Sequence, residues 1–496
     1  MFRRISGLGA VIGIVGIGAA CQPTAAAPLP CPQVAFAAGT ATAAGASGTG
    51  SAAASSAPAA DPRAGMPKAL VEAADKITAA TENRRNAYEW LVKLTDSFGH
   101  RLSGSGSLEK AIDYSVESMK KVGLANPRRE KVMVPHWVRG KESARVVGPS
   151  ERELVMLGLG GSVGTGKKPI TAEVLVVESL DALKAAGEKA KGKIVLVNQV
   201  MPAFEPETNE THYGALGPVR WLAATEAGKV GAVAALVRSV TAKNFRTPHT
   251  GAMAPYEKGA AKIPAAALAP EDADFVARAA KQGAVRIELA MEAKTLPDAE
   301  SANAVAELTG RELPDEVVVV GGHIDSWDVG DGANDDGSGC AMAIDAAAML
   351  KELGLVPKRT VRVVLFTNEE NGLRGGKGYF EAHGKEKHAA AIEADFGAGA
   401  PRGFQMTASK EMIAEVRSWL PLFAGLGVRE ISEGHTGSDI SPLEKAGVTC
   451  LGLEPDGSRY FDVHHSQADT IDKIDPVSLQ KNAGALALMA YLLAER

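Results

Sequence analysis

The amino-acid sequence predicts an α/β protein: a doubly wound, mostly parallel sheet with a smaller domain inserted into it. Over residues 303–496, buried runs of Val and Ile alternate with helical segments, which is typical of parallel strands covered by helices on both faces. Over residues 143–294, short strand-like runs separated by many glycines replace that pattern. We therefore predict that residues 66–140 and 297–496 form the main domain and that residues 141–296 form an insertion.

Helices are expected before the insertion and short strands within it. Apolar residues at helical spacing predict helix within residues 67–98 and again over residues 107–122. Short apolar runs flanked by glycines then predict the strands of the insertion. These strands are expected over residues 170–178, 192–199, 231–239, 262–269 and 284–292.

The main domain resumes after the insertion with alternating strands and helices. Strands are expected over residues 315–325, 360–370 and 389–397, and helices over residues 338–354 and 376–383. In an open sheet of this kind, ligands bind beyond the carboxyl ends of the strands. The residues that follow each strand are therefore the candidates for a functional site.

The first 21 residues have the features of a signal peptide. Two arginines precede an uncharged stretch from Ile5 to Ala20, which is shorter than the roughly 18 residues that a membrane-spanning helix needs. Small residues before Cys21 resemble a lipoprotein cleavage box, and ordinary cleavage further downstream is the alternative. Residues 22–65, rich in Ala, Gly and Ser, are predicted to be a disordered linker. We expect an exported protein that is periplasmic, lipid-anchored in the membrane through Cys21, or secreted.

Charge and cysteine content narrow the class of partner. The formal net charge is -5 and both signs are interspersed, so no nucleic-acid partner and no polybasic membrane surface are expected. The four cysteines have no metal-site spacing, and Cys340 and Cys450 are predicted to be buried free thiols. A small-molecule or peptide partner fits this composition better.

Acidic and imidazole side chains follow several successive strands of the predicted sheet. So many converging carboxylates would repel one another unless a cation neutralised them. Imidazole and carboxylate ligands without thiolates suit a catalytic zinc site. The candidate residues are His323, Asp325, Asp335, Asp336, Glu369, Glu370, Glu393, Asp395, His464 and His465.

Spacing suggests a division of roles within this set. His323 and Asp325 are two residues apart on an extended segment and so point the same way, which lets one bind metal while the other braces it. Of the adjacent Glu369 and Glu370, one can bind metal while the other acts as general base. His465 is expected to follow a strand end and to supply a further ligand.

Two glycine-rich patterns and one further loop are weaker candidates. Residues 160–164 match G-x-S-x-G and residues 161–168 nearly match a phosphate-binding loop, but a strand rather than a helix is expected to follow. We interpret both as an ordinary glycine-rich loop. His435 and Asp439 lie on another glycine-rich segment, where substrate contact and a simple turn are both open.

Several segments together resemble the co-catalytic di-zinc aminopeptidase and glutamate carboxypeptidase superfamily. They are GGHIDSWDVGDGANDDGSG, TNEENG, EADFG, GSDISPLEKAGV and HHSQADT. Further segments, among them VPHWVRG and ITAEVLVVESLD, resemble the plasma glutamate carboxypeptidase branch, so the likeness covers nearly everything after the linker. The segment NGLRG at residues 371–375 is closer to bacterial aminopeptidases, which leaves the substrate preference open.

The resemblance implies specific roles at matching positions. His323 and Asp395 would hold one zinc ion, Glu370 and His465 a second, and Asp335 would bridge them. Asp325 would orient His323, Glu369 would be the general base for a metal-bridging water, and His464 would stabilise the oxyanion or simply pack. The peptide bond between Asp335 and Asp336 would be cis.

The resemblance also implies a reaction. The expected activity is hydrolysis of dipeptides or short peptides with two zinc ions per chain. An aminopeptidase is the alternative enzyme, and a non-catalytic binding lipoprotein on the same scaffold is the alternative from another class. The insertion would correspond to a protease-associated domain that shapes the substrate entrance, and a homodimer is one state that the resemblance allows.

Overall fold

The computed structural model of the chain describes residues 61–148, 150–258 and 261–496. The predicted signal peptide, Cys21 and most of the predicted linker lie outside these residues, and residues 61–65 form a turn ahead of the first helix. The described residues belong to one compact unit. None of their helices has the length and apolar character needed to cross a membrane.

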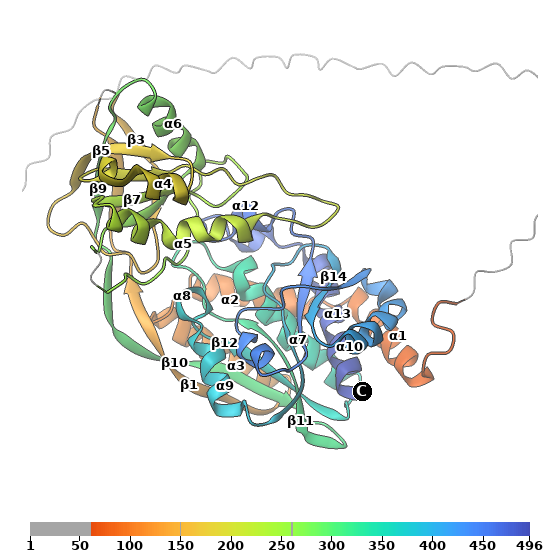
Figure 1. The fold of residues 1–496 in the computed structure, drawn as a ribbon. Coiled ribbons are helices and arrows are strands. Elements are labelled where there is room, and N and C mark those ends of the chain that lie inside the picture. The colour runs from red at the N-terminus through yellow and green to blue at the C-terminus, as the bar shows by residue number, and fades with distance from the viewer. Residues whose placement is uncertain (1–60, 149, 259–260) are drawn as a thin grey trace, which may run out of the picture. The chain divides into compact units, whose positions relative to one another are not determined.

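A first sheet has eight strands in the order β1-β10-β12-β11-β13-β16-β14-β15. Its strands β1, β10, β11, β12 and β14 are labelled in Figure 1. Its central strands β12, β11, β13 and β16 are parallel, whereas β1 and β10 pair antiparallel on one side and β14 runs antiparallel to β16 on the other. The predicted fold class is confirmed, with antiparallel pairs added outside the parallel centre. The strands are β1 (Ala125–Val138), β10 (Lys294–Leu308), β11 (Leu313–His323), β12 (Arg359–Phe366), β13 (Lys387–Glu393), β14 (Pro401–Thr407), β15 (Glu430–Glu433) and β16 (Cys450–Pro455).

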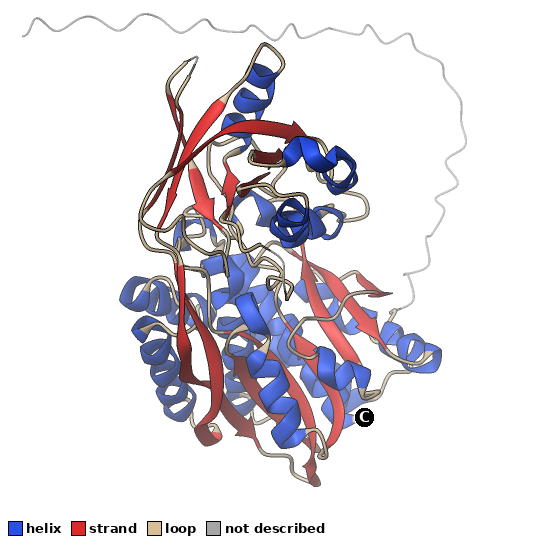
Figure 2. Cartoon of the chain, turned by 60° about the vertical axis from the view of Figure 1, so that its left-hand side comes forward, coloured by secondary structure: helices blue, strands red, loops and turns tan. Residues whose placement is uncertain are grey.

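Helices cover both faces of this sheet, because its central strands are apolar on both sides (Figure 2). Val318 and Val320 of β11 face one core, whereas Val317 and Val319 face the other, as the two-residue period of a strand requires. The larger core contains α1 (Lys68–Glu82), α2 (Asn86–Phe98), α3 (Gly106–Lys121), α7 (Ser338–Glu352), α10 (Lys410–Ser418) and α13 (Pro476–Glu495), and the smaller contains α9 (Arg374–His383) and α11 (Ser441–Lys445).

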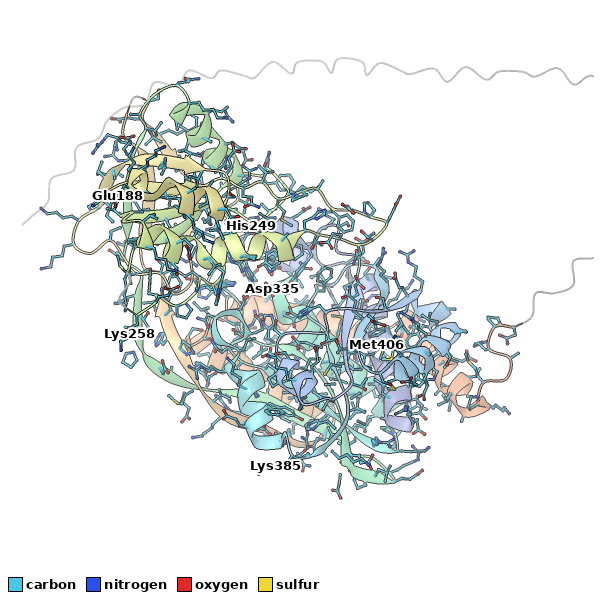
Figure 3. All side chains as sticks on the ribbon, in the orientation of Figure 1. Glu188, His249, Lys258, Asp335, Lys385 and Met406 are labelled. Carbon is cyan, nitrogen blue, oxygen red and sulfur yellow. The ribbon has the colours of Figure 1, made fainter. Side chains whose placement is uncertain are left out.

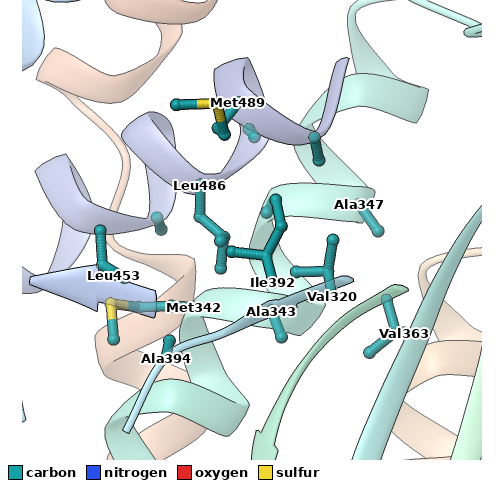
Figure 4. Packing of buried hydrophobic residues seen from close by; sticks show 14 of the residues in the cluster. Val320, Met342, Ala343, Ala347, Val363, Ile392, Ala394, Leu453, Leu486 and Met489 are labelled. Atoms are coloured by element: carbon teal, nitrogen blue, oxygen red, sulfur yellow. The ribbon is translucent and has the colours of Figure 1, made fainter. Parts of the chain in front are cut away.

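Figure 4 shows how the larger core closes over the parallel strands. Leu486 and Met489 of α13 lie over Val320 and Ile392, and Met342 of α7 fills the space beside them. These side chains are buried almost completely. The packing fixes the positions of β11 and β13, whose ends carry site residues.

A second sheet of eight strands has the order β3-β2-β9-β5-β6-β7-β8-β4. Its strands β5 to β8 are parallel, and three helices accompany them. All of its strands lie between Glu142 and Met291, and the domain boundaries inferred from the sequence stay a prediction. The elements are β2 (Glu142–Val146), β3 (Arg152–Leu154), β4 (Met156–Gly158), β5 (Ile170–Val177), α4 (Leu180–Ala186), β6 (Ile194–Val197), α5 (Tyr213–Lys229), β7 (Ala234–Arg238), β8 (Ala265–Leu268), α6 (Pro270–Ala280) and β9 (Arg286–Met291).

The glycine-rich stretch at residues 160–168 is a loop, as expected, and it leads into β5 rather than into a helix. The Ser162 hydroxyl donates to the carbonyl of Val163 and accepts the backbone N–H of Ala265, so it is committed to holding the loop. Neither a nucleophile elbow nor a phosphate-binding loop is present at these residues.

Candidate metal centre

The predicted site residues meet beyond the carboxyl ends of the parallel strands. His323 is the last residue of β11, Glu370 lies on the short helix α8 (Glu369–Gly372) after β12, and Asp395 follows β13 by two residues. His465 comes after the short helix α12 (Tyr460–Val463), so the expectation that it follows a strand end directly was wrong. Asp335, labelled in Figure 3, lies between His323 and His465.

One side of the cluster is formed by His323, Asp335 and Asp395. The Nε2 atom of His323 lies 3.2 Å from Oδ1 of Asp335 and 3.3 Å from Oδ1 of Asp395. The His323 ring is buried, and its other nitrogen, Nδ1, lies 3.0 Å from the main-chain carbonyl oxygen of Asp325. That carbonyl can only accept, so Nδ1 carries the proton and Nε2 is free to bind a cation.

The other side is formed by His465 and Glu370, again with Asp335. The Nε2 atom of His465 lies 2.9 Å from Oε2 of Glu370 and 3.1 Å from Oδ2 of Asp335. Asp335 therefore offers one carboxylate oxygen to each side. This is the arrangement that a carboxylate shared by two metal ions requires.

Two buried oxygens at the centre of the cluster make no hydrogen bond. They are Oδ2 of Asp335 and Oε1 of Glu370. Although Asp335 Oδ2 lies close to the His465 ring, the approach has no hydrogen-bond geometry, which is expected when atoms converge on a common point instead of on each other. Buried carboxylate oxygens without partners are costly, and a cation would satisfy them.

The electrostatics of the cluster lead to the same conclusion. Burial, and next the nearby charge of Asp335, raise the pKa of Glu370 to about 8. Burial also raises the pKa of Asp395 to about 6, although His323 opposes it. Burial acts in the same direction on Asp335, but the imidazoles of His464, His323 and His465 hold its pKa well below the usual range. The candidate ligand atoms described above are oxygen and imidazole nitrogen, a set that fits zinc.

Asp325 is hydrogen-bonded to the segment that carries Glu369 and Glu370. The Asp325 carboxylate is fully buried and accepts the backbone N–H of Glu369 at 3.0 Å and of Glu370 at 3.4 Å. The carboxylate lies 3.7 Å from Nδ1 of His323, whereas the main-chain carbonyl oxygen of Asp325 lies 3.0 Å from that nitrogen. Asp325 thus ties the end of β11 to the segment after β12 that carries both glutamates.

Two further carboxylates that sequence reasoning left without a role support the cluster. Asp336 follows a cis peptide bond from Asp335, as expected, and accepts the backbone N–H of His323 at 2.9 Å and of Gly339 at 2.9 Å. Asp469 accepts the backbone N–H of Asn334 at 2.8 Å and of Asp335 at 3.1 Å. Both are acidic residues within the motif segments, but the backbone groups that they hold are visible only in three dimensions.

The three weaker candidates have different surroundings. His464 is buried, its Nε2 atom lies 3.3 Å from Oδ2 of Asp335, and its ring stacks on His465 with 3.5 Å between centroids. Asp439 is buried behind the cluster, where its Oδ1 accepts the Gly376 N–H and its Oδ2 has no partner. His435 is exposed, and its backbone N–H donates to the side chain of Gln405.

Residues attached to the second sheet also reach the cluster. Arg220 of α5 donates from Nη1 to the hydroxyl of Tyr213 at 2.6 Å, and the same atom lies 3.5 Å from Nδ1 of His465. Nη1 also donates to the main-chain carbonyl of Thr250 at 3.5 Å, and within residues 61–148, 150–258 and 261–496 the Arg220 guanidinium forms no ion pair with a carboxylate. Cys340 and Cys450 are buried free thiols, as predicted, and the Cys340 thiol donates to the carbonyl of His323.

Comparison with known proteins places this geometry in a family. A sequence profile of peptidase family M28 matches residues 303–490. Carboxypeptidase Q of Mus musculus is 42% identical over 415 residues, which is 83% of this chain and 86% of that protein. Carboxypeptidase Q of Homo sapiens is 41% identical over 431 residues, covering 86% of this chain and 88% of that protein.

The chain belongs to peptidase family M28.

The resemblance to the carboxypeptidase Q branch is confirmed, and the protein is a metallopeptidase of this family. The crystal structure of a peptidase M28 precursor from Shewanella amazonensis, 33% identical, superposes with a TM-score of 0.83 and covers 86% of this chain and 97% of that one. A zinc aminopeptidase from Bacillus subtilis, 20% identical with a TM-score of 0.60, shares the fold over 82% of this chain and 94% of its own.

Proposed function

We propose that this M28 peptidase is a two-zinc exopeptidase that hydrolyses dipeptides or other short peptides. The observation that carries the proposal is the convergence of two imidazoles and three carboxylates, with Asp335 directing one oxygen to each side of the cluster. In this assignment His323 and Asp395 hold one ion, Glu370 and His465 hold the other, and Asp335 is shared. When bound, the two ions would polarise the scissile carbonyl and lower the pKa of the attacking water.

Glu369 is the proposed general base. It accepts a proton from the attacking water and later delivers it to the leaving amine. Its backbone N–H is held by the Asp325 carboxylate, so its side chain begins from a fixed point beside the ligand Glu370. Asp325 acts as a positioning residue: its carboxylate holds the segment that carries both glutamates, and its main-chain carbonyl braces His323.

His464 is the candidate for stabilising the developing oxyanion. Its ring lies against Asp335 and His465, close enough to contact a substrate carbonyl at the cluster. Simple packing of the ring is the alternative role. Unchanged turnover in a His464→Ala variant would leave packing as its role.

Arg220 supports recognition of a free carboxylate, and hence a dipeptidase or carboxypeptidase. Its guanidinium is partly buried beside His465, and among the described residues it has no carboxylate partner. Nη1 donates to the Tyr213 hydroxyl and the Thr250 carbonyl, whereas Nε makes no hydrogen bond with these residues. A partly buried guanidinium is best satisfied by a bidentate anion. The terminal carboxylate of a short peptide bound at the cluster is an anion of that kind.

The test is a panel of substrates assayed with and without a chelator. Free dipeptides, N-acetylated dipeptides and aminoacyl anilides show whether the enzyme needs a free amino terminus or a free carboxyl terminus on its substrate. Cleavage of free dipeptides that a chelator abolishes is the expected result. Cleavage of the anilides alone would establish the aminopeptidase alternative, and no cleavage together with no bound metal would establish the non-catalytic alternative.

Two further proposals concern the whole chain. The sheet between Glu142 and Met291 corresponds to a protease-associated-like insertion that shapes the substrate entrance, which is supported by the approach of Arg220 to His465. Export guided by the first 21 residues would place the enzyme outside the cytoplasm. Mass spectrometry of the mature N-terminus distinguishes lipid attachment at Cys21 from ordinary cleavage.

A further inference from the structure

His465 has an unusual backbone conformation for a residue that must aim its ring. Its φ angle is 57°, in the left-handed region that residues other than glycine adopt at a cost of about 1 kcal/mol. It comes two residues after the last residue of α12, so no regular element supports it. Such a conformation persists only when its surroundings hold it.

The holding contacts come from the second sheet. Nδ1 of His249 lies 2.6 Å from the carbonyl oxygen of His464, and the backbone N–H of Thr250 donates to the carbonyl of His465 at 2.9 Å. Since a carbonyl can only accept, His249 Nδ1 must carry the proton and donate. His249 thus holds the carbonyl group before His465, and the next residue, Thr250, holds the carbonyl group of His465 itself.

His249 is itself anchored. It is only 3% exposed, and its backbone N–H donates to the hydroxyl of Ser239, the residue directly after β7. That hydroxyl donates in turn to the carbonyl of Leu268 at the end of β8. The donor on His249 is therefore fixed to the rigid part of the second sheet.

Thr250 is anchored in the same way. Its hydroxyl donates to the carbonyl of Gly158, the last residue of β4, at 2.7 Å. Its backbone N–H consequently has little freedom to move away from His465. His249 and Thr250 are thus both attached to strands of the second sheet. His464 and His465, whose carbonyl groups they hold, belong to the domain of the first sheet.

We infer that His249 and Thr250 are positioning residues for His465, and that the second sheet thereby completes the metal centre on the first. By holding the carbonyls of residues 464 and 465, they keep the His465 ring directed at Glu370 and Asp335. The inference rests on the proposed role of His465 as a metal ligand. Residues 249–250 would then control the affinity for zinc. This role is separate from the proposed role of the insertion in shaping the substrate entrance.

The experiment compares His249→Leu with His249→Asn in the full chain. Leucine fills the space without a donor, whereas the amide nitrogen of asparagine stands at the same number of bonds from Cα as Nδ1 of histidine. The measurements are zinc bound per chain and zinc dissociation constants by competition with a chelator. His388→Leu is the matched control, because His388 also places Nδ1 against a main-chain carbonyl, that of Glu386, at 3.1 Å but away from the cluster.

We expect His249→Leu to bind one of its two zinc ions about 10- to 100-fold more weakly, as is typical when support of a metal ligand is lost. His249→Asn should recover most of that affinity, and His388→Leu should bind both ions as the wild type does. Thermal unfolding of the zinc-loaded proteins shows whether each variant is folded. If His249→Leu does not fold, near-wild-type zinc affinity in His249→Asn still supports the inference.

Wild-type zinc affinity in folded His249→Leu would overturn the inference and leave the proposed function intact. Equal weakening in His249→Asn and His249→Leu would also overturn it, because the donor would then be irrelevant. A wild-type chain that binds no zinc would instead remove the proposed function, and this inference with it. The three results are distinguishable in one titration series.

Discussion

Replacing Asp325 by Asn should reduce catalysis without removing a metal ligand. The Asp325 carboxylate accepts the backbone N–H groups of Glu369 and Glu370 with separate oxygens. Asparagine keeps one acceptor oxygen and turns the other into an NH₂ donor, which would face one of these N–H groups. One charge-assisted hydrogen bond is therefore lost and one donor is left facing another.

The size of the effect follows from that lost bond. A hydrogen bond to a charged group contributes about 1.5–3 kcal/mol, and each 1.4 kcal/mol corresponds to about tenfold in rate. We expect kcat/KM for a free dipeptide to fall by about 10- to 150-fold. The assay belongs at pH 8, because burial raises the pKa of Asp325 to about 6 and the carboxylate must be ionised in the wild type.

Asp345→Asn is the matched control for this experiment. Asp345 is also buried, on α7, where it accepts from Arg84 and from Gln480 well away from the cluster. Its replacement should lower the thermal stability but leave kcat/KM of the folded enzyme unchanged. A kcat/KM within twofold of the wild type in Asp325→Asn would refute the positioning role.

Other substitutions test separate parts of the account. Glu369→Gln should lower kcat about 10²- to 10⁴-fold at unchanged zinc content, and loss of zinc would contradict its role as base rather than ligand. Arg220→Gln should raise KM for free dipeptides about tenfold or more. KM for amidated dipeptides should change little, and equal effects on both would argue against carboxylate recognition. The hydrogen bond that His383 donates to the Glu130 carboxylate raises the pKa of His383 above 6.5. The stability from this contact is thus complete below pH 6.5 and disappears as the pH rises through the raised pKa. The Tm difference between wild type and His383→Gln should shrink from pH 6 to pH 9, and a constant difference would exclude the contact.

The centre of the fold was predictable because its strands are buried on both faces. The apolar runs of β11, β12 and β13 clearly predict strands. Because helices separate these strands along the chain, a parallel sheet was expected, with the carboxyl ends of the strands at one edge. The flanking strands were missed for the opposite reason. In β1 (Ala125–Val138) four consecutive charged residues, 128–131, come before the short apolar segment 132–134, so the strand lacks the long apolar run that marks a buried strand.

The short helix α12 was missed because four residues carry no helical period. The contact between His249 and His464 joins two loop residues 215 positions apart, and no local pattern encodes it. The same holds for Arg220, which is 245 positions from His465. The residue types at strand ends therefore suggested which groups could bind metal. The residues that position these groups could be identified only from the structure.

The most direct test is a zinc titration of the metal-free full chain, followed by hydrolysis of a free dipeptide. Asp335 directs one oxygen to each of two sides, so we expect activity to be absent without metal and to reach its maximum at two zinc ions per chain. Activity that is complete at one ion, or that does not depend on zinc, would contradict it.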